Sequence, residues 1–186
     1  MTVPSRLDAR FREAASRAGL LDVGYDVVDS PVGPLLLAAT ERGLLRISFD
    51  IDPERQLELL ARLAGPRVLR APRAVDAAQR ELDDYFEGRR REFDLTLDLR
   101  GLTAFTIRVL AELARVPYGR TSTYAELARR SGRPKAARAV GMVMNRNPLP
   151  IVLPCHRILG SSGGLVGYGG GLHVKEALLR LEGVTL

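Results

Sequence analysis

The sequence predicts an α+β fold in two parts: a small sheet with helices packed on it, followed by a helical part that contains a helix-turn-helix. Short apolar runs between Gly, Pro and Asp residues dominate the first hundred positions, whereas helical spacing of apolar residues dominates thereafter. The charge changes at the same place. Residues 1–100 carry 16 basic and 18 acidic side chains, net −2, and residues 101–186 carry 12 and 4, net +8. We therefore expect two domains, 1–98 and 99–186.

The first domain begins with a predicted helix and three predicted strand segments. The helix over residues 5–18 is indicated by apolar side chains at helical spacing, at Leu7, Phe11, Ala14 and Ala18. Gly19 is a typical helix end. A strand is expected over 23–28, and a hairpin over 34–49 turns at Glu41, Arg42 and Gly43.

Two further helices and a last strand complete the first domain. Asp52 is the predicted N-cap of a helix over 53–64 that has proline as its first residue. Another helix is expected over 75–86, and it ends at Gly88. Alternating apolar residues in FDLTLDL predict a strand over 93–99. We find no chemical motif in this domain, and we expect its aromatic and acidic side chains in the core and on the surface.

The segment TSTYAELARRSGRPKAARAVGMVMNRNP predicts the helix-turn-helix. Thr123 and Glu126 fit the capping box of a first helix over 124–130, which a Ser-Gly-Arg triplet ends. A basic, alanine-rich second helix is expected from Pro134 to about Arg146. The second helix of such a motif usually enters a groove of DNA, where small side chains beside a basic one allow close approach. The residues concerned are Ala136, Ala137, Arg138 and Ala139. Packing of helix on helix is the alternative explanation of the alanines.

Composition excludes several classes of function. A single cysteine can form neither an internal disulfide nor a thiolate-rich zinc site, and the glycine-rich run 163–171 fits no common phosphate-binding pattern. The amino terminus lacks the apolar stretch of a signal peptide, and no segment approaches the roughly 18 to 20 apolar residues of a membrane span. We expect a cytoplasmic protein without metal or cofactor. The basic second domain favours a polyanion such as nucleic acid as its partner, with a solvated charged face as the alternative.

Cys155 and His156 stand side by side in IVLPCHRILG, although the chain has one cysteine and two histidines. The thiolate is the reactive form of cysteine, and His156 or Arg157 would favour it by charge. Three nearby prolines predict an extended path up to the cysteine. Adjacent side chains of an extended strand face opposite ways, so a turn or a bridging water would be needed to bring imidazole and thiol together. A buried structural thiol is the alternative.

PCHR, preceded by NPLPIVL, with TSTYAEL and GRPKAARAVG upstream and GYGGGLHVKEALLRLEG downstream, resembles the O6-alkylguanine-DNA alkyltransferase family. These motifs span about residues 99–186 in the family's order, and SPVGPLLLAATERGLLRISF matches more loosely in the first half. The resemblance implies a ribonuclease H-like first domain and a winged-helix-like second one. It also implies direct-reversal DNA repair, in which an alkyl group moves irreversibly from guanine O6 to the protein once.

The resemblance implies a role for each matching residue of the site. Cys155 would take the alkyl group, and His156, through a water, and Glu182 would activate it, which is the general logic of an activated nucleophile. The remaining implied positions are the donors of the guanine's proton, Tyr124 and Lys175; the hinge to the recognition helix, Asn147; and the walls of the guanine pocket, Tyr168, Gly169 and Ile158.

The implied partner is double-stranded DNA containing O6-alkylguanine, which a monomer approaches from the minor groove with the damaged base flipped out. Extruding the base costs a few kcal/mol, and Arg138 would fill the gap it leaves. Lys135 and the alanines around Arg138 would contact the duplex, and affinity would be mostly electrostatic and salt-dependent.

Two other functions remain as alternatives at this point. A damage-sensing DNA-binding module would flip bases without repairing them, although the family's sensors lack the cysteine that this chain keeps. A thiol hydrolase using Cys155 and His156 would turn over small acyl substrates, and the basic domain and Arg138 argue against it.

Overall fold

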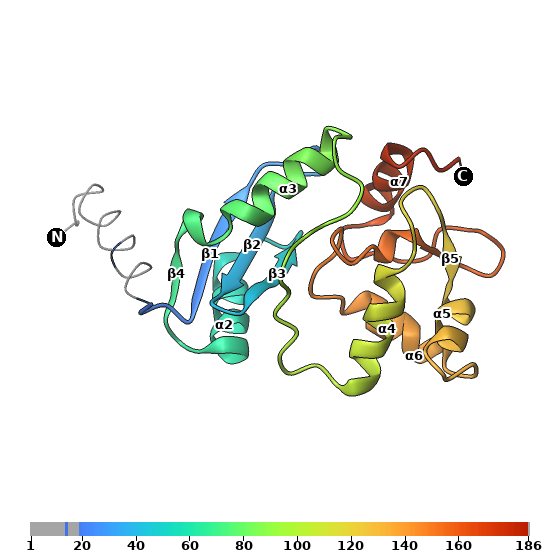
Figure 1. The fold of residues 1–186 in the computed structure, drawn as a ribbon, viewed down its shortest axis with the longest axis horizontal. Helices are drawn as coiled ribbons and strands as arrows, with labels where there is room; N and C mark the ends of the chain where they lie inside the picture. Colours follow the sequence, from blue (N-terminus) through green and yellow to red (C-terminus); the bar gives the residue numbers. More distant parts are fainter. Residues whose placement is uncertain (1–13, 15–18, 186) are drawn as a thin grey trace. The chain divides into compact units, whose positions relative to one another are not determined.

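The computed structural model describes Ala14 and residues 19–185 (Figure 1). The helix predicted over 5–18 lies outside these residues, apart from Ala14. The chain divides into two compact units. The first comprises residues 1–83 and 94–100, and the second comprises residues 84–93 and 101–186.

A four-stranded sheet in the order β3-β2-β1-β4 forms the centre of the first unit. Its strands are β1 (Val23–Val28), β2 (Leu35–Thr40), β3 (Gly43–Ser48) and β4 (Val68–Arg70). The hairpin predicted over 34–49 is confirmed as the antiparallel pair of β2 and β3. β4, which pairs parallel with β1, was not predicted because three residues are too few to show a period.

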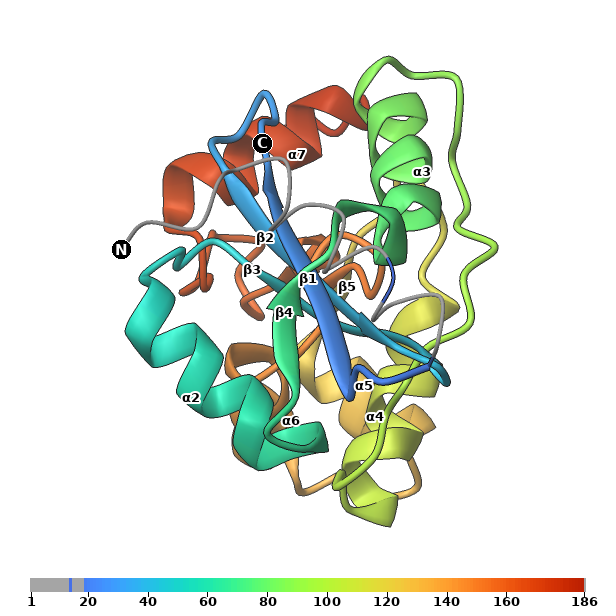
Figure 2. The same cartoon turned by 90° about the vertical axis from the view of Figure 1, so that its left-hand side faces the viewer.

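Helices cover both faces of this sheet (Figure 2). On one face, α2 (Pro53–Ala64) begins at the predicted cap, where the Asp52 carboxylate accepts from the Arg55 N–H, and Leu60 packs against β1, β2 and β3. On the other face lie the short helix η1 (Pro72–Ala74) and α3 (Asp76–Phe86), close to the predicted range. The last three residues of α3 are grouped with the second unit.

The strand predicted over 93–99 is wrong. Only an isolated bridge between Leu97 and Leu44 forms there, fixed by hydrogen bonds of the Leu44 backbone with Thr96 and Asp98. The approach is so close that a Cβ on Gly43, whose φ is 129°, would collide with the Thr96 carbonyl. Alternation made the segment compatible with a strand, but pairing at one point does not make a ladder.

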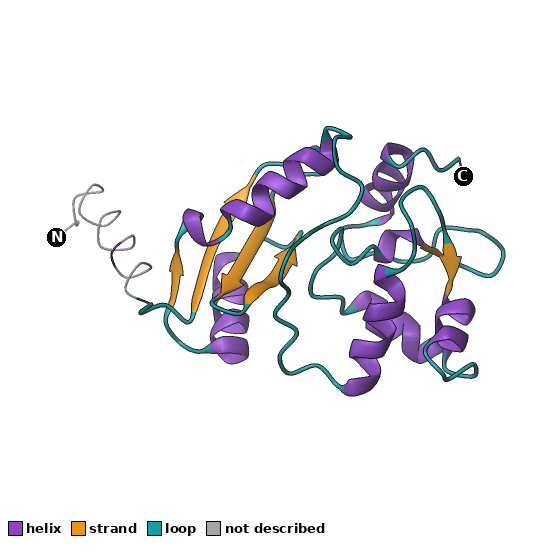
Figure 3. Ribbon diagram, viewed as in Figure 1, coloured by secondary structure: helices purple, strands orange, loops and turns teal. Residues whose placement is uncertain are grey.

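The second unit is mainly helical (Figure 3). In chain order its elements are α4 (Ala104–Ala114), β5 (Ser122–Thr123), α5 (Tyr124–Arg130), α6 (Ala137–Asn145), the single-turn helix η2 (Cys155–Arg157), β6 (Ile158–Leu159) and α7 (Leu172–Leu181). The two short strands pair in parallel, with Ser122 opposite Ile158 and Thr123 opposite Leu159, which joins the segment before α5 to the segment after η2. None of the helices in the described part of the chain is long and apolar enough to cross a membrane.

The helix-turn-helix is confirmed as α5 and α6, with two corrections. The second helix begins at Ala137 and not at Pro134, because the residues from Pro134 to Ala136 form a turn that the Ala136 N–H closes on the Arg133 carbonyl. The capping box is half formed. Thr123 accepts from the Glu126 N–H as predicted, whereas the Glu126 carboxylate accepts from Arg129.

Candidate active site

Cys155 is the first residue of the η2 turn and is 6% exposed. Asn147 holds it in place. The Asn147 Nδ2 donates to Sγ at 3.1 Å and to the Leu153 carbonyl at 2.8 Å, while Oδ1 accepts from the Leu149 N–H at 3.1 Å. Asn147 lies two residues beyond the end of α6, so it connects the second helix of the motif to the sulfur.

The segment 147–155 does not follow the extended path that its prolines predicted. Pro150 and Leu153 form an isolated bridge around a turn, and the buried Ile151 in that turn has a φ of 76°. A positive φ is rare for a β-branched residue and costs on the order of 1–3 kcal/mol. Proline restricts the residue before it, and Ile151 follows a proline without preceding one, so its backbone was free to turn.

His156 faces Glu182, the residue that caps the carboxyl end of α7. Nε2 lies 2.8 Å from Oε1, and both side chains are fully buried. Because the carboxylate can only accept, Nε2 carries the hydrogen and Nδ1 is left as an acceptor. Nδ1 is buried and has no hydrogen-bond partner within the described residues. The single-turn helix η2 supplies the turn that we expected at Cys155 and His156, and a water between imidazole and thiol stays a prediction.

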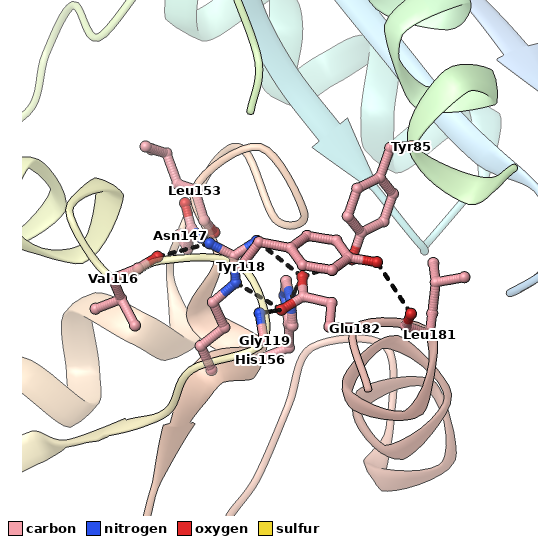
Figure 4. A network of polar contacts seen from close by, with 10 residues as sticks. Tyr85, Val116, Tyr118, Gly119, Asn147, Leu153, His156, Leu181 and Glu182 are labelled. Carbon is pink, nitrogen blue, oxygen red and sulfur yellow. Dashed lines mark hydrogen bonds and ion pairs between the residues drawn. The ribbon is translucent and has the colours of Figure 1, made fainter. Parts of the chain in front are cut away.

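Three more groups bind the Glu182 carboxylate (Figure 4). Arg157 donates from Nε to Oε2 and from Nη2 to Oε1, both at 2.8 Å. The Gly119 N–H donates to Oε2 at 3.2 Å, and the Tyr85 hydroxyl donates to Oε1 at 2.8 Å. With His156, the carboxylate accepts five hydrogen bonds, a number that stabilises its ionised form.

Sequence reasoning missed two of these groups. Arg157 was considered only as a charge near Cys155, whereas its guanidinium forms a fork on Glu182 and also donates to the Val116 carbonyl at 2.6 Å. Tyr85 was assigned to the core, and it is indeed fully buried, but its hydroxyl reaches the site. No local pattern indicates a hydrogen bond between residues 97 positions apart.

Electrostatics leaves the thiol protonated. Burial raises the pKa of Cys155 to about 11, and the hydrogen bond from Asn147 and the charge of Lys175 oppose that rise without cancelling it. Burial likewise lowers the pKa of His156, although Glu182 acts the other way. Burial alone would raise the pKa of Glu182, but the hydrogen bonds from His156 and Arg157 lower it to about 2. Neither neighbour in sequence makes Cys155 a thiolate at neutral pH.

Lys175 is buried in α7 and binds two backbone carbonyls. Its Nζ donates to Ile158 at 2.5 Å and to Val166 at 3.0 Å, which ties β6 to the glycine-rich loop. Burial lowers the pKa of the ammonium, and the nearby Cys155 opposes this. Lys175 and Glu182 are both buried at the carboxyl-terminal helix, and the proton-donating role of Lys175 stays a prediction.

Tyr124 and Arg138 line one cavity of about 420 Å³ between the helix-turn-helix and the glycine-rich loop. Its other lining residues are Ala137, Gly141, Met144, Asn145, Val166 and Gly167. Burial, and then the neighbouring Cys155, raise the pKa of Tyr124, so its hydroxyl is a donor at neutral pH. Arg138, one of the lining residues, is exposed.

The other predicted contacts divide into exposed and buried groups. Lys135 is exposed, and the three alanines Ala136, Ala137 and Ala139 are half-buried. The surface around Arg138 is therefore basic and carries mainly short side chains. Gly169 is exposed and Tyr168 half-buried, with the Tyr168 ring edge-on to His156 at 6.5 Å. Ile158 is completely buried in β6.

Comparison with known proteins shows the family to which the chain belongs. The model of the 6-O-methylguanine DNA methyltransferase DNA-binding domain matches residues 104–184, and that of the ribonuclease-like domain matches residues 23–99. A methylated-DNA–protein-cysteine methyltransferase of Methanosarcina barkeri is 43% identical over 85% of this chain and 96% of its own length. The chain belongs to the 6-O-methylguanine DNA methyltransferase family. Membership confirms both the resemblance and the predicted fold class.

Members of the family with solved structures have the same fold. Mycobacterium tuberculosis OGT in complex with DNA is 43% identical, with a TM-score of 0.75 over 86% of this chain and 92% of that one. The methyltransferase of the hyperthermophilic archaeon Pyrococcus kodakaraensis is 26% identical, with a TM-score of 0.60. In the methyltransferase described here, no group of three or more His, Cys, Asp or Glu side chains among the described residues could hold a metal ion.

Proposed function

We propose that this methyltransferase repairs O6-alkylguanine in double-stranded DNA by taking the alkyl group onto Cys155 in a single, irreversible turnover. The observation that carries the proposal is the η2 turn, in which the one cysteine of the chain is held by Asn147 and followed by a buried His156–Glu182 pair. The turn adjoins a helix-turn-helix whose second helix presents the exposed Arg138. A single cysteine that must stay reduced favours the cytoplasm.

The transfer is a direct displacement at the alkyl carbon. The Sγ–C bond forms as the C–O6 bond breaks, and the electron pair of the broken bond stays on the guanine oxygen. The thiol proton passes through a water to Nδ1 of His156, the buried acceptor, while Glu182 stabilises the resulting imidazolium. Tyr124 gives a proton to the guanine and regains one from solvent. His156 then releases to solvent the proton that it received. The net change moves one hydrogen from sulfur to guanine.

DNA recognition in this proposal uses the surface of α6. Arg138 enters the stack in place of the extruded base, and Lys135 and the alanines let the helix approach the minor groove. The cavity beside Tyr124 receives the flipped guanine, and Val166 and Gly167 of the glycine-rich loop line it. Tyr168 and Gly169 follow them in the same loop and do not line the cavity in the protein without DNA. Ile158 supports this side from the core, because its side chain is completely buried.

A duplex containing O6-methylguanine tests the proposal. After incubation under reducing conditions, mass spectrometry of the peptide bearing Cys155 should find one methyl group in place of the thiol hydrogen, in stoichiometric yield. The Cys155→Ala variant should bind the same duplex without forming an adduct. Binding by the unaltered protein without any adduct would identify a damage sensor. Repeated turnover of small acyl substrates, with no methyl group on Cys155, would identify a thiol hydrolase.

A further inference from the structure

Oε1 of Glu182 accepts three hydrogen bonds at the same length. His156 Nε2, Arg157 Nη2 and the Tyr85 hydroxyl each lie 2.8 Å from it. Oε2 accepts the other two, from Arg157 Nε and the Gly119 N–H. Three donors on one carboxylate oxygen compete for its lone pairs. The hydrogen bond from Tyr85 therefore reduces the capacity of Oε1 to accept a strong hydrogen bond from His156.

Tyr85 is held so that its hydroxyl keeps this contact. The side chain is fully buried, and its ring lies 5.4 to 6.1 Å from three other aromatic rings, those of Phe86, Phe93 and Tyr118. Burial raises the pKa of the hydroxyl, and the charge of Glu182 raises it further, so it remains a donor at all pH values of interest. The donor is thus fixed both in position and in protonation state.

The competition at Oε1 affects the proposed base. A donor on a carboxylate spreads its negative charge, which weakens the carboxylate as an acceptor from a second donor. The imidazolium that forms when His156 takes a proton is stabilised by the charge on Oε1. Tyr85 therefore weakens His156 as a base, while Arg157 and Gly119 still fix the plane of the carboxylate.

We propose that Tyr85 is a positioning residue of the alkyl-transfer site, whose hydroxyl on Oε1 of Glu182 limits how readily His156 takes the proton of Cys155. The inference rests on the proposed function, since it concerns the proton that leaves the thiol during transfer. Tyr85 lies near the end of α3, and no motif in the first hundred residues indicated that this helix contributes to the chemistry.

Two substitutions that change the donor in opposite directions test the proposal. Tyr85→Phe removes the hydroxyl and leaves the ring. Site-specific replacement of Tyr85 by 3,5-difluorotyrosine keeps the shape and makes the hydroxyl a stronger donor. Tyr118→Phe is the matched control, because its hydroxyl donates to the Leu181 carbonyl beside Glu182 and not to the carboxylate. The chain has only two histidines, so the exposed His173 is an internal reference in NMR spectra.

The first readout is the Nε2–H proton of His156 in 15N-edited spectra of the free protein at pH 7. Tyr85→Phe should move it downfield, because its hydrogen bond to Oε1 strengthens. Difluorotyrosine should move it upfield, and Tyr118→Phe should leave it unchanged. The second readout is the single-turnover rate with free O6-benzylguanine. Transfer should be about threefold faster in Tyr85→Phe if the pKa of His156 rises by about one unit, because only part of a change in base strength appears in the rate of proton transfer. The difluorotyrosine protein should transfer the alkyl group more slowly.

Several outcomes would overturn the proposal. An Nε2–H shift that is the same in all variants would do so, as would slower transfer in Tyr85→Phe with an unchanged shift, which indicates a purely structural tyrosine. If Tyr85→Phe does not fold, the difluorotyrosine protein carries the test, and an unshifted proton there counts against the proposal. The NMR readout needs no DNA and no transfer, so failure of the unaltered protein to form a Cys155 adduct would contradict the proposed function separately.

Discussion

Replacing Glu182 by Gln should be among the most destabilising single changes in the second unit. The Gln amide has the same shape, but it has one acceptor oxygen where the carboxylate had two, and its NH2 group faces donors. Five donors bind the carboxylate, and the Arg157 guanidinium, which is 6% exposed, would lose its counter-charge. Removing one member of a buried ion pair costs about 3–5 kcal/mol. We expect that loss in the free energy of unfolding at pH 7.

The pH dependence of the free energy of unfolding tests the same prediction independently. Hydrogen bonds from His156 and Arg157 hold the pKa of Glu182 at about 2 in the folded protein, below its ordinary value of 4.5. A lowered carboxyl pKa stabilises the fold above pH 4.5, and this contribution disappears as the pH falls towards 2. At 1.36 kcal/mol per pKa unit, the contribution is about 3 kcal/mol. The stability gap between the unaltered protein and Glu182→Gln should therefore narrow by that amount between pH 5 and pH 2.

Urea unfolding followed by far-ultraviolet circular dichroism, at pH 7 and at steps from pH 5 to pH 2, measures both quantities. Glu176→Gln is the matched control, because Glu176 lies on the same helix and forms an exposed i,i+4 pair with Arg180, so its loss should change stability by less than about 0.5 kcal/mol. Equal midpoints for Glu182→Gln and Glu176→Gln at pH 7 would refute the reasoning. So would a gap that stays constant down to pH 2.

Two further predictions concern the helix-turn-helix. Arg138→Ala should slow repair of O6-methylguanine in duplex DNA more than transfer from free O6-benzylguanine, because only the duplex needs the gap in the stack filled; single-turnover rates with the two substrates check this, and equal slowing would exclude the role in base extrusion. Thr123→Ala should lower the free energy of unfolding by about 1 kcal/mol, since the Glu126 N–H loses its cap, and a urea midpoint equal to that of the unaltered protein would contradict the cap.

Elements with strong local signals could be predicted from the sequence. The hairpin over 34–49 and the helix that begins after Asp52 depend on turn and cap residues next to one another in the chain. The first helix of the motif, which begins after Thr123, was predicted with the bounds it has. The strand over 93–99 failed because alternation within a segment does not say whether a partner strand runs alongside it.

The residues of the candidate site also fall into those that local motifs predicted and those that only the structure revealed. Cys155, His156 and Glu182 were predicted because their motifs match a family, and the structure brings the last two into direct contact. The fork of Arg157 and the hydroxyl of Tyr85 are contacts over 25 and 97 positions, which neither spacing nor composition encodes. The chemical roles of all these residues stay predictions until the substitutions are made.

The burial that builds this network also keeps its thiol protonated. With its pKa raised to about 11 by burial, Cys155 is almost entirely a thiol at pH 7. A protein that uses its cysteine once would be wasted if oxidants or unrelated electrophiles consumed the sulfur first, and thiolates are the form they attack. If Cys155 takes the alkyl group as proposed, its proton leaves as the alkyl carbon arrives, and a base must receive that proton. In the proposed mechanism that base is His156, whose Nε2 is fixed on Glu182 and whose buried Nδ1 has no hydrogen-bond partner within the described residues.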